Sequence, residues 1–90
     1  MWWKLRHGER NYPPRYRFKI QEEGAISAGW WREPRRCKVC DISSGGAGVE
    51  LDSDEPLPRI LFLFLPAERM SARVRVVWQQ GRRAGLQFLE

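Results

Sequence analysis

Apolar and polar residues alternate in short segments along most of this chain, and the 3.6-residue period of an amphipathic helix is scarce. The clearest example is Arg15–Ile20, RYRFKI, in which each basic residue is followed by an apolar one. Neighbouring side chains of an extended strand point to opposite faces, so this segment predicts a strand with one buried face and one cationic, solvated face. Similar patterns predict five more strands, at residues 35–41, 47–51, 59–65, 71–79 and 84–89.

Turn signals separate these predicted strands. They include Ser43–Gly46, the proline-containing and acidic loop 52–58, the break at 66–70 and the glycine turn at 80–83. Six short strands at this spacing favour an antiparallel barrel or sandwich, and closure would remove exposed strand edges. We therefore predict an all-β fold, a small six-stranded antiparallel β-barrel. Two strands carry further detail: residues 59–65 are apolar on both faces, as in a strand buried between layers or in a barrel wall, and Val74, Val76 and Trp78 share one side of 71–79.

The chain has 90 residues, which is enough for one small domain. Residues 1–14 form a basic lead-in whose Pro13–Pro14 pair excludes a regular helix through it. We predict a flexible N-terminal arm at 1–14, a barrel domain at 15–90 and no helix after the last strand. The longest apolar run, Ile60–Leu65, is far shorter than a membrane span of roughly 20 residues, so a cytoplasmic protein is expected.

Positive charge is concentrated in the first half of the chain. Residues 1–45 carry ten Lys or Arg and five Asp or Glu, whereas residues 46–90 carry six of each, so the whole net charge of +5 lies before Gly46. Thirteen of the sixteen basic residues are Arg, whose planar guanidinium suits phosphates and guanine edges. An anionic partner for the N-terminal half is one interpretation, and simple solubility is the other.

The residues needed for catalysis or metal binding are few. Cys37 and Cys40 form one CxxC pair on a predicted strand, where side chains three positions apart face opposite ways, so we expect two reduced thiols and no metal. The single histidine, His7, lies in the lead-in. The glycine-rich segment 43–48 lacks the Gly-Lys-Ser/Thr of a P-loop, and the acids of loop 52–58 are typical of a solvated turn. We expect neither an enzyme nor a cofactor.

Binding is better supported, because residues 41–49, DISSGGAGV, combine an acceptor, hydroxyls and glycines. Asp41 can accept hydrogen bonds from Arg or from guanine N–H groups, Ser43 can donate to a phosphate, and glycine lets backbone amides approach an anion. An ordinary tight turn would explain each of these residues singly. The basic cluster Arg35, Arg36 and Lys38 precedes this turn in the sequence.

These residues resemble the D/N-x-S-x-x-G motif of the PilZ domain, the bacterial receptor module for cyclic di-GMP. Asp41, Ser43 and Gly46 match the motif positions, and the resemblance extends through residues 59–65, 74–78 and 84–88 to the end of the chain. It implies a barrel that binds cyclic di-GMP and signals to an effector protein, as a monomer or as a ligand-induced dimer.

The family's other motif, R-x-x-x-R, precedes the first strand and holds the ligand phosphates. In this chain Arg10 and Arg15 are separated by four residues, whereas Arg6 and Arg10 have the three-residue spacing but lie farther from the strand. The resemblance implies that Arg6, Arg10 and Arg15 pair with phosphates and stack on guanine. It also implies that Asp41 accepts from guanine while Ser43 and Gly46 meet polar edges of the ligand.

Two alternatives remain open. The irregular arginine spacing, with the pairs Trp2–Trp3 and Trp30–Trp31, favours a PilZ-like protein-interaction module that does not bind the dinucleotide. Trp30–Trp31 would otherwise cover one barrel end. The other alternative is nonspecific nucleic-acid binding through the basic stripe of 15–19, and the pattern disfavours it because alternation places the aromatics on the face opposite the charges.

Overall fold

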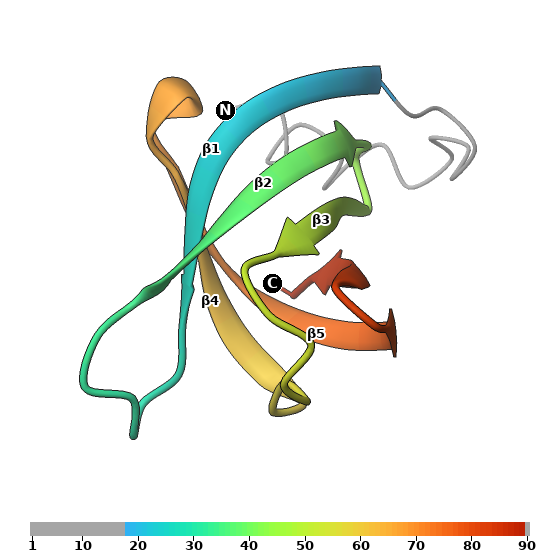
Figure 1. The fold of residues 1–90 in the computed structure, drawn as a ribbon. Helices are drawn as coiled ribbons and strands as arrows, with labels where there is room; N and C mark the ends of the chain where they lie inside the picture. Colours follow the sequence, from blue (N-terminus) through green and yellow to red (C-terminus); the bar gives the residue numbers. More distant parts are fainter. Residues whose placement is uncertain (1–17, 90) are drawn as a thin grey trace.

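A computed structural model describes residues 18–89 and shows a closed antiparallel barrel (Figure 1). The order around the barrel is β1-β2-β3-β6-β5-β4, and β4 pairs with β1 to close it. The prediction of an all-β, six-stranded barrel is confirmed. The elements are β1 (Phe18–Ser27), β2 (Arg35–Ile42), β3 (Gly46–Leu51), β4 (Ile60–Leu65), the 3-10 turn η1 (Pro66–Glu68), β5 (Met70–Gln80) and β6 (Arg83–Phe88).

The first strand is longer than the sequence predicted. The alternation of apolar and basic residues ends at Ile20, yet β1 continues to Ser27. Its next inward positions hold Glu22 and Gly24, which are not apolar side chains. Exposed positions still recur at every second residue, at Lys19, Gln21 and Glu23, so the period of the strand is kept and only the apolar pattern is lost. A β-bulge between Lys19 and Glu22 also shifts the register of β1 against β2. Beyond the bulge, Ile26 enters the core. The predicted arm at 1–14 lies outside the described residues.

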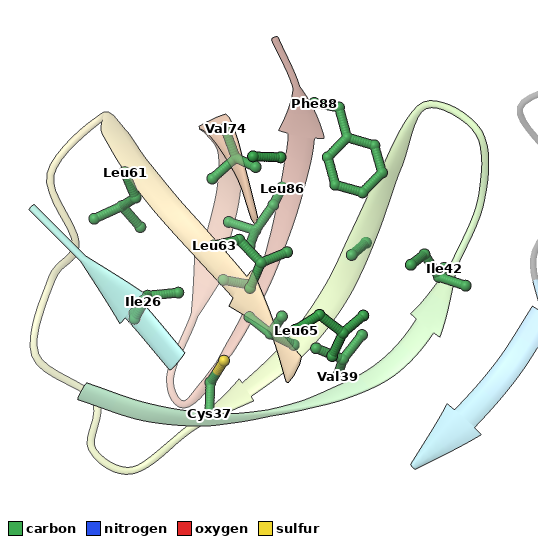
Figure 2. Close-up of a cluster of buried hydrophobic side chains, with 14 of the residues drawn as sticks. Ile26, Cys37, Val39, Ile42, Leu61, Leu63, Leu65, Val74, Leu86 and Phe88 are labelled. Atoms are coloured by element: carbon green, nitrogen blue, oxygen red, sulfur yellow. The ribbon is translucent and has the colours of Figure 1, made fainter. Parts of the chain in front are cut away.

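The core fills the barrel with side chains from every strand (Figure 2). Alternate residues of each strand point inward, which places β-branched and leucine side chains in the interior and polar residues outside. Full burial of one such side chain contributes about 1.5–3 kcal/mol. The largest fully buried side chains are Ile26, Val39, Val49, Leu61, Leu63, Leu65 and Val74.

The predicted placement of Trp78 is wrong. Alternation put it on the same side as Val74, but it faces outward and is 49% exposed, whereas Val74 is fully buried. The reason is a second bulge, between Val76 and Trp78, where β5 shifts register against β6. The additional residue, Val77, leaves both Val77 and Trp78 exposed on the outer surface.

Glu22 occupies an inward position at the η1 end of β1, beside Glu68. Its Oε1 atom is buried and has no hydrogen-bond partner among the described residues. Burial raises the pKa of Glu22, and the neighbouring carboxyl group of Glu68 raises it further. The folded barrel therefore holds this proton more tightly than the unfolded chain, in which the ordinary value is 4.5.

Replacement of this carboxyl by an amide should make stability less dependent on pH. Since the pKa of Glu22 is raised in the folded state, its favourable contribution is complete below about pH 4.5 and is lost as pH rises through the raised pKa. We expect Glu22→Gln to be more stable than the parent at pH 7, with the difference shrinking toward pH 4. Urea unfolding at pH 4, 5, 6 and 7 measures this, and a difference that stays constant with pH would contradict it.

Candidate functional site

The turn between β2 and β3 is shaped by Ser43. Its backbone N–H donates to the Gly46 carbonyl at 2.8 Å, and its Oγ accepts from the N–H groups of Gly45 and Gly46 at 3.2 Å each. The Oγ also lies 3.4 Å from the Gly46 carbonyl oxygen, to which it donates. The side chain is buried, so the hydroxyl serves the turn itself. Ser43 fixes the loop that follows Asp41.

Gly46 brings β3 close to β6. A Cβ atom at this position would overlap the carbonyl group of Leu86, which belongs to the backbone and cannot rotate away. Next to it, the Phe88 N–H donates to the Gly45 carbonyl at 2.9 Å. Only glycine fits at position 46, where the turn joins the barrel wall, because any side chain would overlap the backbone of β6.

Asp41 lies beside a β-bulge, and its carboxylate packs against Gly48 of the neighbouring strand. Between Val39 and Asp41 the register of β2 against β3 shifts, which leaves Cys40 as an additional residue and turns Asp41 outward. Asp41 pairs with Gly48, and its carboxylate oxygens lie 2.8 and 3.0 Å from where a Gly48 Cβ would be. The absence of a side chain at Gly48 thus gives the carboxylate its place on the barrel surface.

Cross-strand pairing extends this arrangement into a row over five strands. Lys19 pairs with Asp41, Asp41 with Gly48, Gly48 with Gly85, and Gly85 with Trp78. Directly paired residues project from the same side of a sheet. The Trp78 indole lies on Gly85, where it would overlap any Cβ atom, and this contact buries Gly85 although it faces outward. The aromatic ring of Trp78 and the carboxylate of Asp41 therefore lie on two adjacent glycines. We call Asp41, Gly48, Gly85 and Trp78 the glycine platform.

An open hollow of about 700 Å³ adjoins the platform at Asp41. It lies over the bulges of β1 and β2, and Lys19, which the sequence assigned to a solvated strand face, is exposed at its rim. Such bulges commonly redirect side chains next to binding sites. Its lining residues are Lys19, Ile20, Gln21, Cys40, Asp41, Glu50 and Arg83.

Basic and acidic side chains alternate from strand to strand in the row next to the glycine platform. A second row runs from Glu23 to Lys38, then to Glu50 and Arg83, so each basic residue has an acidic cross-strand neighbour. Opposite charges at such positions attract and reduce the net field. Within residues 18–89, this surface alone does not provide the excess positive charge that two phosphates would need.

Arg35, from the basic cluster that precedes the Asp41 turn in the sequence, lies away from that turn in the structure. It begins β2, whereas Asp41 lies near the other end, and its guanidinium contacts Asp52 at 3.2 Å, Ser53 at 2.8 Å and Glu55 at 3.4 Å. The same group lies 5.0 Å from the centre of the Trp31 ring. The acidic loop therefore engages Arg35, which joins the β1–β2 and β3–β4 loops away from the platform.

The two cysteines are free thiols on opposite sides of β2, as the strand pattern predicted. Cys37 is buried in the core, and this burial, with smaller contributions from Asp52, Cys40 and Glu23, raises its pKa to about 12. A thiol with so high a pKa is a poor nucleophile and metal ligand at neutral pH. Cys40 lines the hollow.

Within the part of the chain that the structure describes, no three His, Cys, Asp or Glu side chains gather as metal ligands. In the same part, no helix is long and apolar enough to cross a bilayer. The three predicted arginine ligands, Arg6, Arg10 and Arg15, lie outside residues 18–89, so the structure brings together only the second half of the predicted site: Asp41, Ser43 and Gly46.

The sequence analysis missed Gly48, Gly85 and Trp78 as site residues. A signal was present, because single glycines inside strand patterns indicate a bulge or a close approach. The doubled Val76–Val77 also interrupts the alternation before Trp78. Neither signal shows that the two glycines are neighbours, since this depends on the pairing of β3 with β6.

Comparison with known proteins agrees with the geometry. The PilZ domain family model matches residues 4–90, so the chain belongs to the PilZ domain family, the family of cyclic di-GMP receptor modules. A crystal structure of an uncharacterized Legionella protein is similar, with a TM-score of 0.55 and 22% sequence identity over 83% of this chain and 77% of that chain. That likeness supports the fold. No curated protein matched the chain.

Proposed function

We propose that this domain is a cyclic di-GMP receptor without catalytic activity of its own, which signals to a partner protein. The observation that carries the proposal is the glycine platform, because it joins an acceptor for base N–H groups to an aromatic stacking surface. Guanine offers N–H donors along one edge and a flat face for stacking. In this proposal Asp41 accepts from the base edge while the exposed face of Trp78 stacks on the ring.

Phosphate binding is assigned to the arginines that precede β1. Each basic residue beside the platform has an acidic neighbour, so Arg6, Arg10 and Arg15 are proposed to supply the additional positive charge that the phosphates need. Guanidinium groups form paired hydrogen bonds with phosphate oxygens and also stack on bases. Ligand binding then fixes residues 1–14 over the platform, and the partner recognises the resulting surface.

Loss of a phosphate-binding arginine should weaken ligand binding without unfolding the barrel. A hydrogen bond to a charged group contributes about 1.5–3 kcal/mol, so we expect Arg10→Ala and Arg15→Ala each to lower the affinity for cyclic di-GMP by roughly ten- to a hundredfold. Calorimetric titration of the full chain measures the change. Arg32→Ala, an exposed arginine in the β1–β2 loop, is the matched control and should bind like the parent.

The same titration distinguishes the receptor from the protein-interaction module. A receptor should release or absorb heat on binding, and the amide signals of Asp41, Gly48 and Trp78 should shift in NMR spectra. If the parent shows neither, the domain works through protein contacts alone. If the parent binds but both arginine variants bind equally well, the phosphate assignment is wrong while the platform assignment stands.

A further inference from the structure

The outer face of β4 carries an apolar stripe. Ile60 and Phe62 are 41% and 44% exposed, and Phe64, the next residue on this side, is half-buried. Alternate residues of a strand lie about 6.6 Å apart, so these three side chains form a continuous line. The sequence predicted a strand buried between layers or in a barrel wall; β4 lies in the barrel wall, and no segment within residues 18–89 covers its outer face. Exposed apolar residues are ordinary when scattered, but a line of them indicates a contact surface.

The borders of the stripe differ in chemistry. On one side, β5 places Arg75 opposite Ile60 and Arg73 opposite Phe62. On the other side, β1 places Ser27 opposite Phe62 and Ala25 opposite Phe64. Small side chains on β1 leave room beside the aromatic rings, whereas β5 supplies two guanidinium groups. None of the β4 cross-strand partners in the described pairing is acidic.

Hydrogen bonds hold one of these arginines on the surface. Both Nε and Nη2 of Arg75 donate to Oε1 of Gln87, at 3.3 and 2.8 Å. A guanidinium fixed in this way loses less side-chain entropy when a carboxylate binds it. Aromatic residues and arginine are also the residue types enriched where protein interfaces gain most of their binding energy.

We propose that the outer face of β4 is a docking surface for an acidic amphipathic helix of a partner protein, whose apolar side contacts Phe62 and whose carboxylates pair with Arg73 and Arg75. A helix fits because its apolar residues repeat every three or four positions, about 4.5–6 Å along the axis, and the longer of these spacings is close to the stripe's spacing of about 6.6 Å. The charge of the stripe's border favours an acidic partner over two other candidates, the N-terminal segment of this chain and a second copy of it. Residues 1–17 of this chain hold five Lys or Arg and a single acid, and a second copy would oppose arginine with arginine.

This surface does not depend on the proposed ligand. The glycine platform involves β2, β3, β6 and the last part of β5, whereas the stripe involves β4 and the first part of β5. A variant of Phe62 should therefore keep its affinity for cyclic di-GMP. Failure of the docking proposal and failure of the receptor proposal would be seen in separate measurements.

The test uses two synthetic helical peptides with the same leucine stripe, one flanked by Glu and the other by Lys, titrated into the ¹⁵N-labelled full chain. We expect the Glu peptide to shift amides of β4 and of 70–75 and to bind at least tenfold more tightly than the Lys peptide. Phe62→Ser should weaken this binding at least tenfold, and Arg73→Glu should reverse the preference. Trp30→Ser, which changes an exposed aromatic residue in a loop, should bind like the parent.

Other outcomes would overturn the proposal. They include no binding of the Glu peptide, equal binding of both peptides, shifts located on the glycine platform, or full binding by Phe62→Ser. Self-association in sedimentation that Phe62→Ser abolishes would assign the stripe to a second copy of this chain. Binding to phosphatidylglycerol vesicles that Phe62→Ser and Arg73→Glu both abolish would assign it to a lipid surface. Ile60→Ser provides a second variant if Phe62→Ser fails to fold.

Discussion

Gly46→Ala should unfold the barrel or leave it barely stable. The added methyl group would overlap the Leu86 carbonyl, so β3 and β6 must separate at the point where Gly46 pairs with Gln87. Overpacking against side chains costs about 1–3 kcal/mol, and a backbone carbonyl yields less than a side chain does. We therefore expect the free energy of unfolding to fall by about 3 kcal/mol or more. In a domain of this size that lowers Tm by at least about 12 °C.

Gly45→Ala is the matched control for this effect. Gly45 is the preceding residue in the same turn, it is exposed, and a Cβ atom there would have nothing within 4 Å. Its change in stability should stay within about 0.5 kcal/mol. Thermal unfolding followed by circular dichroism compares the two variants. Equal stability of both would mean that β3 and β6 can separate at little cost, and the structural account of the motif glycine would be wrong.

Asp41→Ala should cause the largest loss of ligand affinity among single substitutions in the described residues. Its carboxylate offers two oxygens at one end of the glycine platform, so the proposed contact with guanine comprises two charge-assisted hydrogen bonds. At about 1.5–3 kcal/mol for each, their removal should weaken cyclic di-GMP binding a hundredfold or more. Calorimetry measures the affinity, and NMR spectra recorded beforehand establish that the variant is folded.

Two companion variants test the geometry behind this prediction. Asp54→Ala removes an exposed carboxylate from the β3–β4 loop and should leave the affinity unchanged. Gly48→Val keeps Asp41 but places a branched side chain where its carboxylate lies, so it should weaken binding toward the level of Asp41→Ala. If Asp41→Ala binds as tightly as the parent, then Asp41 does not contact the base.

The barrel interior was largely predictable because alternation is a local property. Val39, Leu63 and Val74 are buried as the period-2 pattern requires, and the turn at 43–46 lies where its serines and glycines predicted. Two predictions about individual strands failed. The extent of β1 past Ile20 was missed because its next inward positions hold Glu22 and Gly24, which carry no apolar side chain. Trp78 faces outward because of a register shift, which depends on the partner strand and is only weakly indicated by the sequence.

The sequence by itself determined the class of fold, the family motif Asp41, Ser43 and Gly46, and the concentration of arginines before the first strand. Only the tertiary structure decided that Gly48 and Gly85 are neighbours, that Trp78 lies on one and Asp41 on the other, and that Arg35 is engaged elsewhere. The physical reason is that a barrel brings together residues far apart in the chain through hydrogen-bond register. Register is set by the whole sheet and its bulges, whereas alternation is set by each strand alone.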